Sequence, residues 1–384
     1  MNRAMNSTKR AIFCATLMII GLCALPADKA AAHPATGIVV DRKGQVYFSD
    51  LETVWKLSTD GKLSVFRSGV NGRHVHELAI DSEDNIYGAD ISYVSQKWIS
   101  DVWKMTPEGK STYLLEPTDN PPRGMSLWRD HDGNMYIVDQ NNHTKTQTLL
   151  LRRTPDGKVT TFAGSAYGHK DGKGTEARFS SVGGIAFGPD QNLYLTDGTS
   201  VRKVTMDGTV TTVAKDLDVR TSDDKPSLFG GSYGSLSGLS IDSSGNVYVA
   251  DPGNRRLLKI NNGGKVEVVL RSDPPYFPNG VVTTSAGDIY VMEVGFTLPS
   301  KWSGPRIRRI TADGKNILVG QVRAEGGSAE LKAEAAQVAG RSAEATIGFF
   351  YTNAWAKYAA GLLLLSLVPL SIFAWKRRQR KRHA

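Results

Sequence analysis

The chain repeats one pattern, which is clearest in Gly238-Leu239-Ser240-Ile241-Asp242-Ser243-Ser244-Gly245-Asn246-Val247-Tyr248-Val249-Ala250-Asp251. Leu239 and Ile241 alternate with small or polar neighbours, and residues 247–249 are β-branched or aromatic, as is typical of β-strands. Residues 242–245 place turn formers between the two runs. The stretch therefore predicts two antiparallel strands joined by a tight turn.

The pattern occurs six times, each time around a tyrosine. The copies are residues 37–50, 77–90, 126–139, 184–197, 238–251 and 280–293. Each copy is followed by a hydrophobic and basic run, a second turn and a further β-rich run. A unit of four strands cannot bury both faces of its sheet alone, whereas six units stacked around an axis can. The sequence therefore predicts an all-β fold, a six-bladed β-propeller of four-stranded blades.

The copies resemble the NHL-repeat propellers. Residues 168–179 resemble the glycine-rich connector between blades of that family, and residues 251–257 (DPGNRRL) are similar to the part of the repeat that gave the family its name. The resemblance covers residues 33–320. It implies a six-bladed propeller and leaves the activity open, because this architecture carries binding modules, lyases and lactonases alike.

Residues 1–32 predict a secretory signal peptide. Basic residues precede the apolar run 11–25, and small residues at 30–32 offer a cleavage site. An uncleaved membrane anchor is the alternative. Both cysteines, Cys14 and Cys23, lie in this segment, so the exported chain is expected to hold neither a disulfide nor a cysteine metal site.

The region after the propeller changes in composition. Residues 321–346 are rich in Ala, Glu, Gly and Ser and predict a linker. The next segment, 347–375, contains eighteen residues without a charge, 358–375, which as a helix would be about 27 Å long and would span the hydrocarbon core. The basic tail 376–384 is expected in the cytoplasm. The sequence thus predicts a single-pass cell-membrane protein, held in the membrane by its C-terminal helix, with a periplasmic or extracellular propeller.

The net charge of +9 belongs to the two ends of the chain. The signal segment carries +3 and the tail +6, which leaves the intervening residues neutral overall. A neutral propeller lacks the basic surface that phosphate binding requires. Nucleic acid is therefore not an expected partner.

The mouth of the central channel is the expected place for chemistry, because the residues that precede the inner strands converge there. Aligned on the tyrosines, these positions are Thr36, His76, Met125, Gly183, Ser237 and Asn279. The candidate binding residues at or near the mouth are His74, His76, Glu77, Arg123, Ser237, Asn279 and Glu293. Longer loops, at 91–101, 141–148, 221–233 and 295–302, are expected to share one face.

A calcium site is one possibility at this mouth. The chain is distantly similar to gluconolactonase-, paraoxonase- and strictosidine-synthase-like propellers, and Phe277-Pro278-Asn279-Gly280-Val281 resembles the Asn-Gly start of an inner strand in the lactonases. The resemblance implies a calcium ligand at Asn279. The other ligands of those lactonases, a glutamate, an asparagine and an aspartate, have no match at Thr36, Gly183 or Ser237, although calcium takes six or more oxygens.

Histidine offers a second enzymatic alternative. His76 could serve as a general base with Glu77 or Glu293. Adjacent residues of a strand point to opposite faces, however, so His76 and Glu77 are not expected to share the channel. His74 and His76 have the right alternation for one face and could bind zinc or copper, although such a pair is more often a surface feature.

The repeated acids have a structural interpretation. Asp50, Asp90, Asp139, Asp197 and Asp251 each end a predicted second strand, so they are expected to cap turns. The sequence therefore favours a membrane-anchored, extracytoplasmic propeller that binds a protein, glycan or small-molecule ligand through the loops of one face. The alternative is a metal-dependent lactonase, hydrolase or lyase with its site at the channel mouth.

Overall fold

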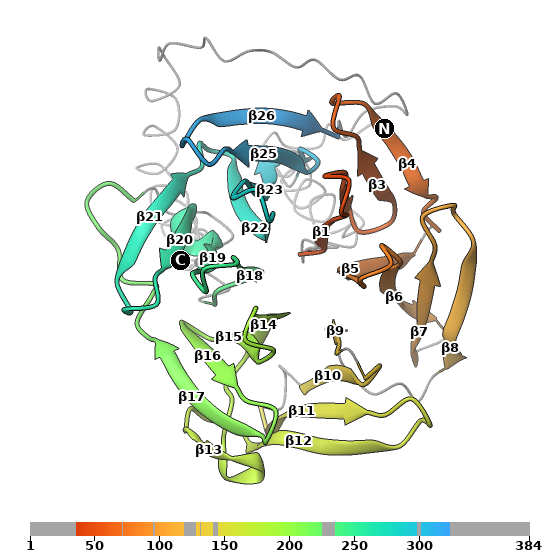
Figure 1. The fold of residues 1–384 in the computed structure, drawn as a ribbon, viewed down its shortest axis with the longest axis vertical. Helices are drawn as coiled ribbons and strands as arrows, with labels where there is room; N and C mark the ends of the chain where they lie inside the picture. Colours follow the sequence, from red (N-terminus) through yellow and green to blue (C-terminus); the bar gives the residue numbers. More distant parts are fainter. Residues whose placement is uncertain are drawn as a thin grey trace, which may run out of the picture. The chain divides into compact units, whose positions relative to one another are not determined.

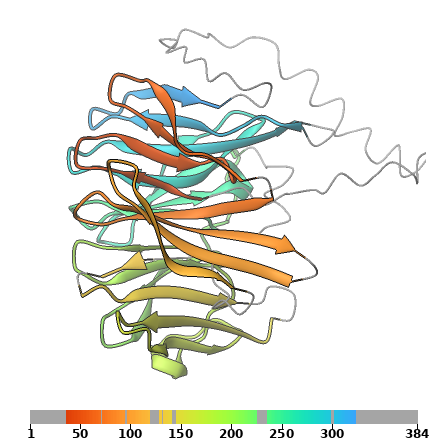
Figure 2. The same cartoon turned by 90° about the vertical axis from the view of Figure 1, so that its right-hand side faces the viewer.

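The computed structural model describes residues 36–70, 72–94, 97–118, 128–130, 132–140, 145–224, 235–297 and 301–322. These residues form six β-sheets arranged around a central axis, which confirms the predicted six-bladed propeller of four-stranded blades (Figure 1). Figure 2 shows the blades edge-on, with their strands running between the two faces of the propeller.

Each blade is built from one continuous segment of antiparallel strands. Blade 1 contains β1 (Ile38–Val40), β2 (Val46–Ser49), β3 (Val54–Leu57) and β4 (Leu63–Arg67). Blade 2 contains β5 (Arg73–Ile80), β6 (Ile86–Val94), β7 (Lys97–Met105) and β8 (Ser111–Thr118). Blade 3 contains β9 (Trp128–Arg129), β10 (Met135–Gln140), β11 (Gln147–Arg153) and β12 (Val159–Ala166).

Blades 4 and 6 each carry one additional short strand. Blade 4 contains β14 (Val182–Phe187), β15 (Leu193–Asp197), β16 (Ser200–Val204) and β17 (Thr209–Ala214), and β13 (Gly172–Lys173) pairs with the outer edge of β17. Blade 5 contains β18 (Leu239–Ile241), β19 (Val247–Asp251), β20 (Arg256–Ile260) and β21 (Val266–Arg271). Blade 6 contains β22 (Tyr276–Thr283), β23 (Ile289–Thr297), β25 (Arg306–Ile310) and β26 (Asn316–Gln321), with β24 (Lys301–Trp302) paired to β23. The 3-10 helices are η1 (Gly174–Glu176) and η2 (Pro252–Asn254).

The core lies between the blades rather than within one sheet. A separate apolar cluster fills each of the six contacts between neighbouring blades. The contact that closes the ring joins the first and last blades through buried residues such as Phe48, Met292 and Ile307. Burial of these side chains provides the main driving force for stacking the blades.

The repeated tyrosines make polar contacts as well as packing. Each tyrosine lies opposite a Lys or Arg of the third strand, in the pairs Tyr47–Lys56, Tyr87–Lys104, Tyr136–Arg152, Tyr194–Lys203, Tyr248–Lys259 and Tyr290–Arg309. The first five hydroxyls donate, at 2.7 to 3.3 Å, to carboxylates of the preceding turn, Asp41, Asp81, Asp130, Asp190 and Asp242. Each of the first five repeats therefore places a turn aspartate, a tyrosine and a basic side chain of the third strand next to one another.

The segments predicted at the two ends of the chain fall outside the described residues. The signal peptide 1–32, the membrane helix 358–375 and the tail 376–384 are among them, and so is the linker beyond Val322. Within the ranges that the structure describes, no helix is both long and apolar enough to cross a membrane.

Candidate functional site

The short turns and the long connections lie at opposite ends of the blades. In blade 5, for example, Gly245 donates to the carbonyl of Asp242 and Gly264 to that of Asn261, which closes two tight turns at one end. Because antiparallel strands alternate in direction, the remaining connections lie at the other end, where the inner strands begin. We call this end the mouth face. Residues 91–101 were expected as a loop, but most of them continue β6 and β7 instead.

Three of the inner strands, β5, β14 and β22, begin with β-bulges, in which two residues face one residue of the second strand. In blade 2, His76 and Glu77 together lie opposite Ala89, and similar shifts interrupt β14 and β22. A bulge changes the direction in which a side chain points. The expectation that His76 and Glu77 point to opposite faces assumed an uninterrupted strand, so the bulge removes its basis.

Small residues let blades 5, 6 and 1 approach one another closely just inside the mouth. Adding a Cβ atom to Gly238 of blade 5 would place it 3.7 Å from the Cβ of Thr36 of blade 1, although these blades are not neighbours. The same atom would lie 2.9 Å from the carbonyl oxygen of Asn279 in blade 6. Three consecutive blades therefore meet at van der Waals distance at this point, which we call the floor of the mouth.

His74 and His76 lie on the blade 2 side of this floor. Their ring centroids are 6.0 Å apart with an interplanar angle of 73°, so the expected pairing of the two imidazoles is present. His76 is buried, and its carbonyl accepts hydrogen bonds from the backbone N–H groups of Thr36 at 2.8 Å and Gly37 at 2.9 Å. His76 therefore connects blade 1 to blade 2 through its backbone.

Ser237 and Asn279 form a second pair on the opposite side of the floor. The Ser237 hydroxyl donates to Asn279 Oδ1 at 2.8 Å, and both residues are buried. Gly238 N–H donates to the Asn279 carbonyl at 2.9 Å, and Thr196 Oγ1 donates to the Ser237 carbonyl at 3.1 Å. These bonds connect blades 4, 5 and 6 at the mouth, and the interaction with Ser237 already uses the side-chain oxygen proposed for calcium.

Glu293 belongs to a different set from the residues around the floor. It is fully buried on β23, where Arg306 Nε lies 2.6 Å and Arg308 Nε 2.7 Å from its Oε2. Its place in the repeat corresponds to that of Asp197 and Asp251, although β23 continues beyond it to Thr297, and it serves in the same way as an ion-pair acceptor within its blade. The remaining candidate, Arg123, lies outside the described residues.

Three of the repeated acids, Asp50, Asp197 and Asp251, accept backbone hydrogen bonds as expected, whereas Asp90 lies inside β6 and does not end it. Asp197 and Asp251 also hold arginines. Asp197 accepts from Ser180 N–H at 2.6 Å and from Arg202 Nη1 at 2.6 Å. Asp251 accepts from Asn254 N–H at 3.2 Å and from Arg256 Nε at 2.8 Å. Because each arginine is buried, the pairing is structural.

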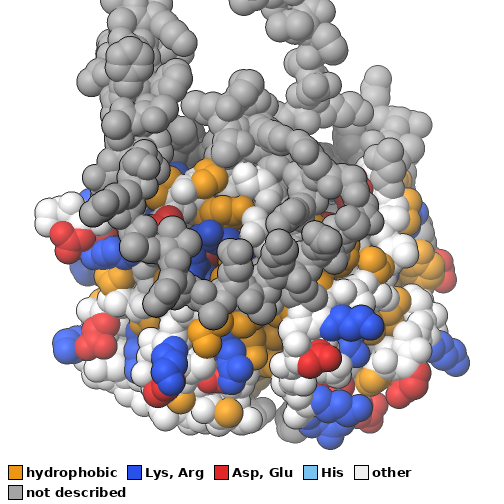
Figure 3. All heavy atoms as spheres, turned by 90° about the horizontal axis from the view of Figure 1, so that it is seen from above, with side chains coloured by type: hydrophobic (Ala, Val, Ile, Leu, Met, Phe, Trp, Pro, Cys, Tyr) orange, Lys and Arg blue, Asp and Glu red, His pale blue; other side chains and the backbone are white. Residues whose placement is uncertain are grey.

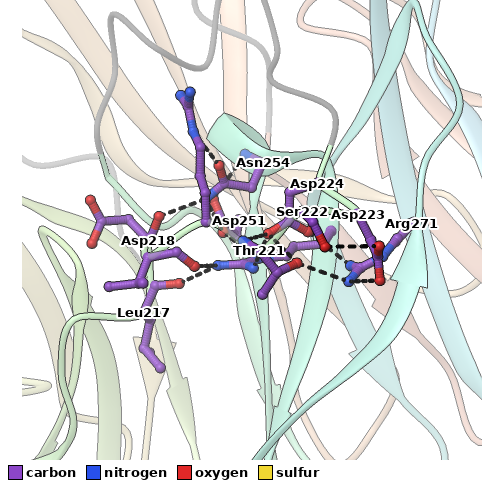
Figure 4. Close-up of polar contacts among 12 residues, drawn as sticks. Leu217, Asp218, Thr221, Ser222, Asp223, Asp224, Asp251, Asn254 and Arg271 are labelled. Carbon is purple, nitrogen blue, oxygen red and sulfur yellow. Dashed lines mark hydrogen bonds and ion pairs between the residues drawn. The ribbon is translucent and has the colours of Figure 1, made fainter.

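The Asp251 site extends into a network that holds the connection between blades 4 and 5 (Figure 4). Arg256 also pairs with Asp224 at 2.5 Å, and its Nη2 donates to the carbonyls of Leu217 and Val219. Arg271 reaches Asp224 from the outer strand at 2.9 Å. Charged contacts on the mouth face therefore fix residues 217–224, the described first part of this connection.

Asp101 was not identified from the sequence. It lies buried on β7 directly opposite Asp90, and Arg73 Nη1 lies 3.2 Å from its Oδ2. Burial, reinforced by the charge of Asp90, raises the pKa of Asp101 to about 6. The only signal in the sequence was the acid inside residues 91–101, which were interpreted as a loop.

The described residues contain no group of three or more His, Cys, Asp or Glu side chains placed to hold a metal ion. On the part of the face drawn in colour in Figure 3, acidic and basic side chains are interspersed. Thr36, His74, Ser237 and Asn279 bring hydroxyl, imidazole and amide groups to the mouth, and these groups can form hydrogen bonds.

Comparisons with known proteins give partial likenesses. No family model matches this chain. Teneurin-3 of Danio rerio is 26% identical over 157 residues, which is 38% of this chain but only 6% of teneurin-3. A virginiamycin B lyase from Staphylococcus aureus has a TM-score of 0.45 and 15% identity, over 74% of this chain and 83% of that chain. A gluconolactonase from Xanthomonas campestris has a TM-score of 0.46 and 14% identity, over 68% and 84%. These likenesses assign no family, and the NHL-repeat interpretation stays a prediction.

Proposed function

We propose that this chain is a membrane-anchored, extracytoplasmic β-propeller that binds a protein, glycan or small-molecule ligand at its mouth face. The observation that carries the proposal is the group of polar side chains that the structure brings to the mouth, Thr36, His74, His76, Ser237 and Asn279. A ligand at this face would contact these side chains. A few polar groups that converge from different elements are typical of binding sites.

The long connections support the same face. The connection between blades 4 and 5 and the β6–β7 hairpin both lie there, and ion pairs of Asp224 and Asp101 fix their bases. Function in repeat scaffolds tends to reside in such connections, while the blades supply rigidity. The signal peptide and the membrane helix predicted from sequence would keep this face outside the cytoplasm.

The test compares two serines of blade 5, Ser237 shortly before β18 and Ser240 within that strand. Ser237 bonds Asn279 at the mouth, whereas Ser240, three residues further along, bonds Thr283 Oγ1 across the same two blades at 2.9 Å. The full-length chain in nanodiscs would be screened by calorimetry against a glycan and metabolite collection that includes lactones. Ligands of the mouth should bind at least tenfold more weakly to Ser237→Ala and equally well to Ser240→Ala. If a ligand binds both variants with the affinity of the wild type, its binding site lies away from the mouth and the proposal is overturned.

The same screen separates binding from the enzymatic alternative. Repeating it with 1 mM calcium, and again with a chelator, tests whether Asn279 contributes to a cation site. Turnover of a lactone that requires calcium and is lost in Asn279→Ala would favour the metal-dependent hydrolase. Binding that is equal with calcium and chelator would favour a recognition module.

A further inference from the structure

The aspartate of the first turn makes two hydrogen bonds in four of the six repeats. In blade 5, Asp242 Oδ1 accepts the N–H of Asn246 at 2.9 Å, and its Oδ2 accepts the hydroxyl of Tyr248 at 3.3 Å. The same pair of bonds occurs at Asp41, Asp81 and Asp130. In blade 4 the acceptor of the tyrosine hydroxyl is also a carboxylate, Asp190. Five repeats thus show that the group bound by this tyrosine is a carboxylate.

Blade 6 keeps the tyrosine but replaces the aspartate by Thr284. The threonine hydroxyl accepts the N–H of Asp288 at 3.1 Å, so the first of the two bonds is retained. Threonine has no second side-chain oxygen to accept from Tyr290. Among the residues that the structure describes, the Tyr290 hydroxyl has no hydrogen-bond partner, although only 9% of this residue is exposed. Burial raises the pKa of Tyr290, so its hydroxyl stays protonated and can donate.

Tyr290 lines a cavity of about 50 Å³ where blade 6 meets blade 1 (Figure 1). The cavity lies at the turn end of the blades, away from the mouth, because two tight turns of blade 1 contribute to its wall. A volume of this size holds roughly three or four waters, or one ligand of similar size. Blade 1 contributes the small and apolar residues Gly44, Val46, Leu57 and Gly61, together with Ser58 and Thr59.

Arg309 adds a positive charge to the same cavity. Its guanidinium lies 6.0 Å from the centroid of the Tyr290 ring. Nε and Nη2 both donate to Asp288 Oδ2, at 2.9 and 2.6 Å. Within the described part of the chain Nη1 makes no hydrogen bond, and 40% of the Arg309 side chain is exposed. Blade 6 therefore offers this cavity two donors, a hydroxyl and a guanidinium.

We propose that this cavity binds a short aliphatic monocarboxylate, such as acetate or propionate. The carboxylate would accept from Tyr290 and Arg309 and so take the part that the turn aspartate has in the other repeats. A hydrogen bond between an ionised acceptor and a guanidinium is stronger than one between neutral groups. The alkyl group would contact Val46 and Leu57. The inference does not depend on the proposed function, because the mouth lies at the opposite end of the blades.

The experiment compares acetate with acetamide, its neutral isostere, by ligand-observed NMR on the full-length chain in nanodiscs and carboxylate-free buffer. Acetate should bind with a Kd on the order of 1 mM, because so small a ligand cannot bind tightly. Acetamide should bind at least tenfold more weakly, and equal binding of the two would contradict the proposed chemistry. Tyr290→Phe should weaken acetate binding at least fivefold. The matched control Tyr248→Phe, which alters a tyrosine already bonded to Asp242, should bind acetate as the wild type does.

A second variant restores the acid of the other repeats. Asp in Thr284→Asp should accept both the N–H of residue 288 and the Tyr290 hydroxyl, so acetate should no longer bind. Its melting temperature should fall by no more than about 2 °C, because the turn keeps its hydrogen bond. If acetate binds Tyr290→Phe and Thr284→Asp as tightly as the wild type, its site lies elsewhere and the inference is wrong. It is equally wrong if neither acetate nor propionate shows saturable binding well above the expected Kd.

Discussion

Asp90 and Asp101 lie directly opposite each other on β6 and β7, so two carboxyl groups occupy one buried cross-strand position. Two guanidinium groups surround them. Arg67 pairs with Asp90 at 2.5 Å, and Arg73 Nη1 lies 3.2 Å from Asp101 and 3.8 Å from Asp90. Within the described residues, Asp101 Oδ1 is buried and has no hydrogen-bond partner. The charges of the four groups balance when both acids are ionised, but one buried oxygen of Asp101 then lacks a hydrogen-bond donor.

Replacing Asp101 by asparagine should stabilise the protein at alkaline pH. The pKa of Asp101 is raised from 3.8 to about 6 in the folded chain, first by burial. A raised pKa means that its contribution to stability is full below about pH 4 and is lost as the pH rises through about 6. Asp101→Asn should leave stability nearly unchanged at about pH 4 and raise it by about 1–2 kcal/mol at pH 8. Urea unfolding of both proteins at the two pH values measures this.

The opposite acid is the matched control. Asp90 accepts the Trp103 indole N–H at 3.2 Å and pairs with Arg67, so its carboxylate has dedicated partners. Asp90→Asn should cost about 2–4 kcal/mol at pH 8, because it leaves a buried guanidinium without its ion pair. If both variants change stability in the same direction at pH 8, the assignment of distinct roles to the two acids is wrong.

Adjacent cations on β16 should differ sharply in their importance. Arg202 is fully buried and pairs with Asp197 at 2.6 Å and Asp171 at 2.7 Å. Arg202→Ala should therefore cost about 3–5 kcal/mol. Its neighbour Lys203 pairs with a partly exposed Asp190 at 2.7 Å, and Lys203→Ala should cost about 1 kcal/mol or less. Equal losses in denaturant unfolding would contradict the distinction between buried and solvated pairs.

The repeat itself could be predicted because its signals are local. The tyrosine, the turn residues and the apolar alternation recur within fourteen residues, so the six blades follow from the sequence alone. The mouth depends on contacts between copies. The proximity of Ser237 to Asn279, and the meeting of Gly238 with Thr36, are set by how blades stack, and no spacing within one repeat encodes them.

The positions of individual site residues were predicted less well than the fold, for two physical reasons. A bulge adds one residue to a strand, and this shift removed the basis of the alternation argument at His76 and Glu77. Glu293 was grouped with the mouth because of its charge, whereas its place in the repeat, which matches that of Asp197 and Asp251, is that of an acid buried in an arginine pair, here with Arg306. Counting residues from the tyrosine was a better guide than residue type.

The close approach of blades at the mouth should make Gly238 intolerant of substitution. A Cβ atom there would lie 2.9 Å from the Asn279 carbonyl oxygen and 3.1 Å from the Gly280 Cα. Gly238→Ala should therefore cost about 1–3 kcal/mol through overpacking. Gly263→Ala lies in a turn at the opposite end of blade 5, where the nearest atom is a side-chain oxygen at 3.3 Å, and should cost less than about 1 kcal/mol. A neutral Gly238→Ala would show that the blades are looser than these contacts imply.

The topology inferred from sequence should be visible by labelling single cysteines. Both native cysteines lie in the predicted signal peptide, so cleavage would leave a chain without thiols. A cysteine in place of Ser342, before the span 358–375, should react with a membrane-impermeant maleimide in spheroplasts or intact cells. A cysteine in place of Ala384 should react only after permeabilisation, because basic segments beside a membrane helix are usually retained in the cytoplasm. Labelling of the Ala384 variant in sealed cells would contradict the proposed orientation. Labelling of the unsubstituted chain would show that the signal segment is retained.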